Sequence, residues 1–223
     1  MKAIFAWLGR VPSAILVFFQ LVQIVAYPFV GDSVVGRIII AVLSVVAVLV
    51  AVWVVRRTPS LTWVAALLAL PALVFGIIDA VSPGVMWAFV LAAIFHVLFY
   101  FYVTWSLIRY LFHDARITTD ELFATLAAFT VVIWAFAYLF LLTETFWPGS
   151  FSLFAGADNP FFAALFLSTT TLSSVGLSDI LPTSDQGRAI MMIGEIVGLF
   201  YMAIIVSRII SISVTVARGR KAN

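Results

Sequence analysis

The sequence predicts an all-α membrane protein with six transmembrane helices and a short re-entrant helix and loop between the fifth and the sixth. Apolar residues make up 65% of the chain, charged residues 10%, and the mean hydropathy is +1.21. A soluble domain of 223 residues could not bury that much apolar surface. Six apolar runs approach the roughly 20 residues that cross a hydrocarbon core about 30 Å thick. A seventh run is too short to cross and leads into a hydroxyl-rich segment.

Polar and turn-forming residues mark the ends of the six long runs. The basic start at Lys2 and Arg10 would also suit a signal peptide, but the long first run lacks a clear cleavage site and favours a helix. Pro71 predicts a kink in the third helix, and Thr118 is a plausible N-cap for the fifth. The predicted helices span residues 12–29, 35–55, 60–78, 83–111, 118–143 and 186–216.

The distribution of basic residues predicts the orientation in the membrane. With the N-terminus inside and six crossings, ten of the twelve Lys and Arg residues lie on the cytoplasmic side, as the positive-inside rule requires. We therefore expect a multi-pass cell-membrane protein with both termini cytoplasmic. The ten residues are Lys2, Arg10, Arg56, Arg57, Arg109, Arg116, Arg208, Arg218, Arg220 and Lys221.

The segment between the fifth and sixth helices does not fit a seventh crossing. Residues 159–168 are apolar with a proline near the start, and residues 169–179 are rich in Ser and Thr. Irregular backbone at membrane depth is stable only where protein buries it or where it lines a water-filled cavity. The pattern therefore predicts a short helix that enters the membrane and a loop that returns.

This loop carries a motif with fixed spacing to later residues. It reads Ser-Val-Gly-Leu-Ser-Asp over residues 174–179, followed by Pro182, the pair Gly187-Arg188, and Gly198. The pattern resembles the selectivity filter of the potassium-channel superfamily, whose core reads T-V-G-Y-G-D, and it keeps the family spacing without a gap. The resemblance covers residues 117–213 and is to bacterial six-helix channels. It implies a tetrameric pore, formed by four copies of the chain.

The resemblance also implies how the loop would handle a monovalent cation. Backbone carbonyls, and the hydroxyl at the inner end, would replace the hydration shell of the ion. Potassium, or sodium, would be the permeant ion, and no cofactor is expected. The loop residues that this assigns to the filter are Ser174, Val175, Gly176, Leu177, Ser178 and Asp179, the first four as ligands of the ion.

Three departures from the family pattern leave the ion selectivity open. Ser174 replaces Thr, Leu177 replaces Tyr, and Ser178 replaces the second Gly. If position 178 needs a left-handed backbone, Ser there costs about 1–2 kcal/mol. A single Gly in the loop also resembles the Trk, Ktr and HKT transporters, which carry potassium or sodium. A weakly selective or sodium-permeable pore is therefore an alternative, as is a loop that conducts nothing.

Residues outside the loop are expected to support it or to gate the pore. Glu195, an acid inside an apolar helix, is expected to bond Thr170, Thr171 or Ser173, with lining of the ion path as the second interpretation. Gly198 suits either a hinge or a close helix contact. Apolar residues follow it at helical spacing and suit either a constriction or bundle packing: Met202, Ile205 and Ile209.

The chain divides into residues 1–112, a four-helix membrane domain, residues 117–217, the pore domain, and residues 218–223, a basic cytoplasmic tail. The fourth helix holds no basic residue before Arg109, so the first domain is not a charged voltage sensor. We expect His96 to be a hydrogen-bonded packing residue and Asp79 an interfacial, solvated acid. The role of these helices stays open.

The function that these residues favour is a passive cation channel, potassium-permeable and homotetrameric. A Trk- or Ktr-like transporter subunit is an alternative of another class, although such chains hold four pore repeats and this one holds one. A secondary transporter with Glu195 and His96 as a proton relay is a further alternative, but the chain lacks the inverted repeat expected of such transporters. No nucleophile–base cluster and no Cys occur, so an enzyme is not expected. The expected partners are membrane lipids, the other copies of the chain and an unidentified regulatory subunit, without nucleic acid.

Overall fold

The computed structural model describes residues 11–30, 34–82, 84–113, 118–152, 154, 157 and 159–221, without the side chains of Val30, Val34, Arg37 and 208–221. Three basic residues of the topology prediction, Lys2, Arg10 and Arg116, lie outside the described residues, as does the predicted start of the fourth helix at residue 83.

The described residues fold into α-helices, and their only strand-like pairing is an isolated bridge between Phe151 and Pro182. Six of these helices are long and apolar enough to cross a membrane, which confirms the six predicted spans. The helix α7 is the short apolar one. The helices are α2 (Pro12–Val30), α3 (Val34–Val55), α4 (Thr62–Val81), α5 (Met86–Leu111), α6 (Thr119–Phe146), α7 (Pro160–Leu172) and α8 (Asp185–Lys221).

Helix ends differ from the predicted ones by a few residues. Helix α4 begins at Thr62 and continues through Pro71, and α5 begins at Met86. The largest difference concerns α8, which was predicted to end at residue 216. Its backbone stays helical to Lys221, so residues 218–221 extend this helix and do not form a separate tail.

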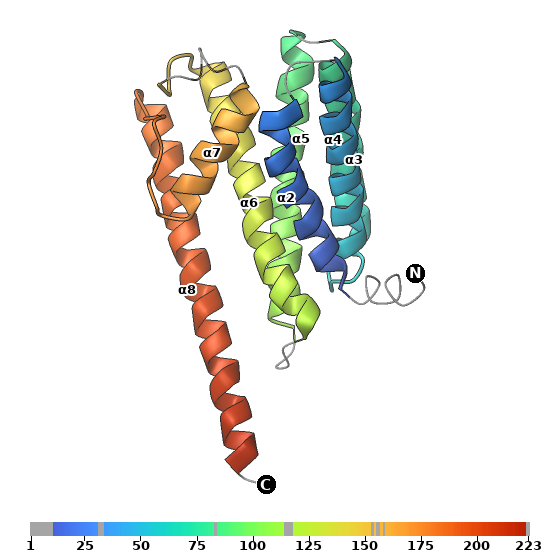
Figure 1. The fold of residues 1–223 in the computed structure, drawn as a ribbon, viewed down its shortest axis with the longest axis vertical. Coiled ribbons are helices and arrows are strands. Elements are labelled where there is room, and N and C mark those ends of the chain that lie inside the picture. The colour runs from blue at the N-terminus through green and yellow to red at the C-terminus, as the bar shows by residue number, and fades with distance from the viewer. Residues whose placement is uncertain are drawn as a thin grey trace.

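The helices run in alternating directions, and α7 descends between α6 and α8 before the chain turns back toward the end at which it entered (Figure 1). Thirteen residues give α7 a length of about 20 Å, less than the roughly 30 Å of a hydrocarbon core. Helix α8 reaches farther down than the other helices (Figure 1). Geometry alone therefore separates α7 from the six long helices.

Helix α6 is the centre of the packing. It contacts α2, α5, α7 and α8, and it is the most buried of the six long helices. Small side chains make this possible because they let neighbouring helix backbones approach closely. The fully buried alanines of α6 are Ala124, Ala127, Ala128, Ala135 and Ala137.

A buried carboxylate fixes the first helix onto α6. Asp120 accepts hydrogen bonds from the backbone N–H of Ser13 at 3.0 Å and from its hydroxyl at 3.3 Å. The first N–H groups of a helix have no partner within the helix, and its N-terminus attracts negative charge. Ser13 lies in the first turn of α2 and Asp120 in the first turn of α6. One carboxylate thus serves the N-termini of both helices.

We predict that Asp120→Ala lowers the free energy of unfolding by about 1–3 kcal/mol, because the buried N–H of Ser13 loses its acceptor. Asp120→Asn keeps one acceptor oxygen and is expected to lose less. The midpoint of thermal unfolding in detergent, followed by tryptophan fluorescence, measures both. Asp185→Asn is the control, since that side chain is 95% exposed. Equal midpoints for Asp120→Ala and the control would contradict the anchoring role.

Candidate functional site: the loop between α7 and α8

Local sequence and one tertiary bond place the start and the middle of α7. The side chain of Asn159 caps the helix by accepting the N–H of Phe162 at 3.0 Å, and Pro160 occupies the first helical position, where no N–H is needed. Farther along, the hydroxyl of Ser168 donates to the carbonyl of Ile133 on α6 at 2.7 Å. This bond is buried, so it fixes α7 in rotation against α6.

The helix extends four residues beyond the predicted end at residue 168. Within this extra turn the hydroxyls find their acceptors by bonding back along the helix. Thr169 donates to the carbonyl of Leu165 at 2.8 Å, and Thr170 donates to that of Leu167 at 3.0 Å. The hydroxyl-rich segment therefore begins as helix and becomes a loop only after Leu172.

The loop leaves α7 through two residues in the left-handed region. Gly176 has φ +65°, a conformation that glycine adopts readily, and Ser174 has φ +58°. The carbonyl of Thr170 accepts the N–H groups of Val175 at 3.1 Å and Gly176 at 3.2 Å, which holds the start of the loop against the helix end. No feature of the sequence indicated the left-handed conformation of Ser174, which costs about 1–2 kcal/mol in a non-glycine residue.

From Ser174 to Leu177 the loop is neither helix nor strand, and it is exposed in the single chain. The side chains of Val175 and Leu177 are 66% and 73% exposed. Ser178 does not have the left-handed backbone considered above. Its hydroxyl accepts the N–H of Ile180 at 3.1 Å. Asp179 is exposed, and no hydrogen bond of its carboxylate occurs in the described part of the chain.

The return of the chain toward α8 is bonded to the segment that follows α6. Glu144 accepts the N–H groups of Gly149 at 2.7 Å and Phe151 at 3.0 Å. Ser152 then donates its N–H to the carbonyl of Leu181 at 2.8 Å, and the N–H of Thr183 donates to the carbonyl of Ser150 at 2.8 Å. Glu144, which no motif in the sequence marked, therefore organises the segment that holds the outer part of the loop.

Helix α8 touches α7 through its backbone. A Cβ on Gly198 would overlap the carbonyl oxygen of Leu172 and lie 2.7 Å from its carbonyl carbon. A Cβ on Gly187 would lie 2.6 Å from the carbonyl oxygen of Ser150. Both positions therefore require Gly for close approach. At Gly198 the geometry is that of a close helix contact, the second of the two interpretations above.

The hydrogen bond expected between Glu195 and the end of α7 does not occur among the described residues of one chain. The hydroxyls of Thr170 and Ser173 donate to backbone carbonyls instead, at 3.0 and 3.3 Å. Thr171 has a buried Oγ1 for which the described residues supply no partner. Glu195 is exposed, and with Thr170, Thr171 and Ser174 it lines one cavity of about 390 Å³ beside the loop.

The three apolar residues considered for a constriction do not share one environment. Met202 is exposed, but Ile205 is buried in the core of its own chain, so packing is its role. The side chain of Ile209 lies outside the described residues. Tyr201, which the sequence analysis did not single out, anchors this part of α8. Its hydroxyl donates to the carbonyl of Thr125, and its ring stacks on Phe129 at 5.3 Å.

Three Gly→Ala substitutions in helices should affect stability in a graded order. At Gly76 a Cβ would make an ordinary contact of 3.5 Å with a side chain, and at Gly194 a tighter one of 3.2 Å with Thr171. At Gly198 it would overlap backbone. Overpacking typically costs about 1–3 kcal/mol, whereas Ala in an open helical site is favoured over Gly by up to about 1 kcal/mol. The thermal unfolding midpoint should therefore be highest for Gly76→Ala, lower for Gly194→Ala and lowest for Gly198→Ala. A midpoint for Gly198→Ala at or above that of either other variant would refute the contact at Gly198.

Comparison with known proteins agrees with this geometry. Residues 122–214 match the family model described as an ion channel. The matched part begins in the first turn of α6, contains α7 and the loop, and ends within α8. No curated protein and no solved structure matches the chain. The match supports an ion-channel family and a passive ion channel. Together with the six long apolar helices it supports a multi-pass membrane protein. The matched residues include those that build the candidate site.

Proposed function

We propose that this chain is a passive, potassium-permeable cation channel in which four copies bring the loops of residues 174–179 together on one axis. The observation that carries the proposal is the arrangement of α7, the loop and α8. A short helix ends beside an exposed, irregular loop that contains two left-handed residues. The ion-channel match covers the same elements.

The exposure of the loop supports assembly around an axis. Val175 and Leu177 are as exposed as side chains on the spanning helices, but they lie in an irregular loop, and irregular backbone at membrane depth must be buried in protein or line a water-filled cavity. One copy of the loop supplies one column of carbonyl oxygens, and a dehydrated cation needs oxygens on all sides. A closed ring of identical chains provides them without an additional subunit. In this assembly Ser174, Val175, Gly176 and Leu177 supply the ligands, and Asp179 raises the local cation concentration.

Helix α7 supports the same function electrostatically. The C-terminal end of a helix carries partial negative charge. This end of α7, at Leu172, lies directly before the loop, so its charge favours a cation there. Glu195 lines the cavity behind this point, and in the proposed assembly its carboxylate braces the loop together with the buried hydroxyl of Thr171.

Bi-ionic reversal potentials in planar bilayers test the proposal. Purified protein with potassium on one side and sodium on the other should give a current whose reversal potential is displaced from zero toward the equilibrium potential of potassium. A reversal near zero would establish the weakly selective alternative. Currents that need a pH gradient or a coupling ion would indicate a transporter. Bilayers that stay silent in both ions would overturn the proposal.

Gly176→Ala should reduce the single-channel conductance severalfold or more and weaken the selectivity. Ala at a left-handed position costs about 1–2 kcal/mol, so the loop is expected to move its carbonyls. Gly84→Ala is a matched control, because Gly84 also has a positive φ, +94°, and neither glycine has an atom within 4 Å of an added Cβ. Equal conductance in Gly176→Ala and the control would show that the loop does not carry the ions.

A further inference from the structure

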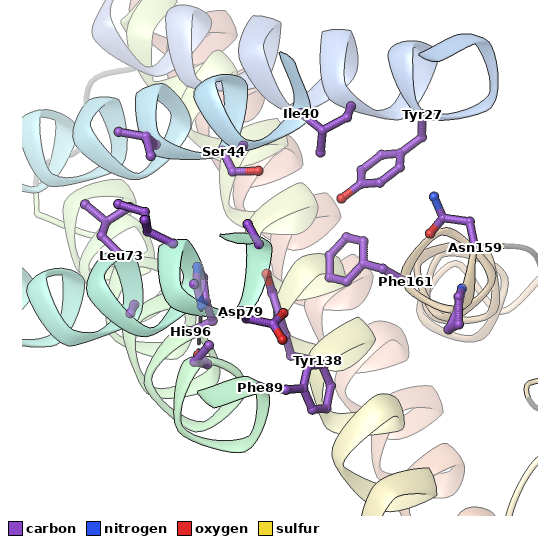
Figure 2. Close-up of a pocket in the computed structure, with 18 of the residues that line it drawn as sticks. Tyr27, Ile40, Ser44, Leu73, Asp79, Phe89, His96, Tyr138, Asn159 and Phe161 are labelled. Carbon is purple, nitrogen blue, oxygen red and sulfur yellow. Dashed lines mark hydrogen bonds between the residues drawn. The ribbon is translucent and has the colours of Figure 1, made fainter. Parts of the chain in front are cut away.

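A second cavity, of about 390 Å³, lies away from the loop, between the N-terminal helices and the start of α7. Residues from α2 to α7 line it, and Figure 2 shows their side chains gathered around one space. Its volume falls in the range of small-molecule sites, about 300–1,000 Å³. The residues that matter for its chemistry are Tyr27, Asp79, Phe89, His96, Tyr138 and Phe161.

Asp79 gives this cavity its charge. It is half-buried near the end of α4 and lines the cavity, so it is less solvated than the sequence suggested. Among the side chains that the structure describes, no Lys or Arg lines the cavity. Within the described part of the chain, the single ion pair joins Arg188 to Asp185, and no hydrogen bond to the carboxylate of Asp79 is present. A carboxylate partly withdrawn from water without a partner favours a cation beside it.

The remaining walls supply π faces and hydrogen-bond acceptors. The ring of Phe161 stacks on Tyr27, with 5.5 Å between centroids, and the ring of Tyr138 stacks on His96 at 4.7 Å. Nδ1 of His96 lies 2.8 Å from the carbonyl oxygen of Ala92. A carbonyl only accepts, so Nδ1 carries the hydrogen and Nε2 of the neutral ring is an acceptor. Aromatic faces attract organic cations, and acceptors suit an N–H donor.

We propose that this cavity binds a small organic cation, an ammonium group on an apolar body, with Asp79 as its counter-charge. The described residues contain no cluster of three His, Cys, Asp or Glu side chains, which a metal ion would favour. An anion would meet Asp79 with no basic partner among the described side chains of the cavity. Asn159, Pro160 and Phe161 also line the cavity, so the occupant contacts the first turn of α7.

Calorimetric titration of the purified chain in micelles of dodecyl maltoside, a detergent without an ammonium group, tests the site, with phenethylammonium chloride as the probe. We expect saturable binding at one site per chain. Phenethyl alcohol, which lacks the charge, should bind at least about tenfold more weakly, because a charge-assisted hydrogen bond contributes about 1.4 kcal/mol or more. 3-Phenylpropionate, an anion of similar size, should not bind.

Two substitutions complete the design. Asp79→Asn keeps the shape of the side chain and should weaken probe binding by about tenfold or more, whereas the control Asp185→Asn, outside the cavity, should bind as the unmodified chain does. Thermal unfolding without probe shows whether Asp79→Asn is folded. Ala41→Phe places a bulky side chain in the cavity wall, leaves the charge in place and should abolish binding.

Three results would overturn the proposal: no saturable binding, equal affinity for the amine and the alcohol, or unchanged affinity in folded Asp79→Asn. Adding phosphatidylethanolamine to the micelles identifies the source of the ammonium. If it competes with the probe, the site takes a lipid headgroup, and if it does not, the site takes a soluble amine. Binding is measured without current, so this test stands or fails independently of ion conduction.

Discussion

The backbone contact between α8 and the end of α7 is the constraint on which the loop geometry depends. At Gly198 the two helices touch without any side chain between them, and the atoms of α7 at this contact belong to Leu172, its last residue. The loop starts at the next residue. A displacement of α8 at this point therefore moves the origin of the loop, because protein interiors are too densely packed to absorb it elsewhere.

A second backbone contact holds the outer side of the same segment. Gly187 lies against the carbonyl of Ser150, and Glu144 organises the residues around it by accepting two backbone N–H groups. Gly187 and Gly198 belong to the spacing on which the family resemblance rests. Each has a local physical reason, since a Cβ would collide with a backbone carbonyl. The spacing thus reflects two points at which α8 must approach the loop and its flanks.

How much the sequence could predict depends on the range of the interaction involved. Hydrophobic length alone located the six long helices, and Asn159 with Pro160 located the start of α7. The end of α7 was missed because threonine hydroxyls can bond within a helix as well as outside it. The positions of Ile205, Tyr201 and Asp79 were not predictable, since burial on one helix depends on neighbours that the local pattern does not contain.

The N-terminal helices reach the candidate site through the start of α7. Phe161 stacks on Tyr27 of α2 at 5.5 Å and packs against Trp134 and Tyr138 of α6 at 5.5 and 4.9 Å. No comparable packing joins α2, α3, α4 or α5 to α8 within the described chain. Coupling between distant sites travels through contacts with alternative arrangements. Within the described chain, the main contacts that lead from the first four helices to the loop therefore run through α6 and the first turn of α7, and the aromatic cluster around Phe161 is where both routes meet.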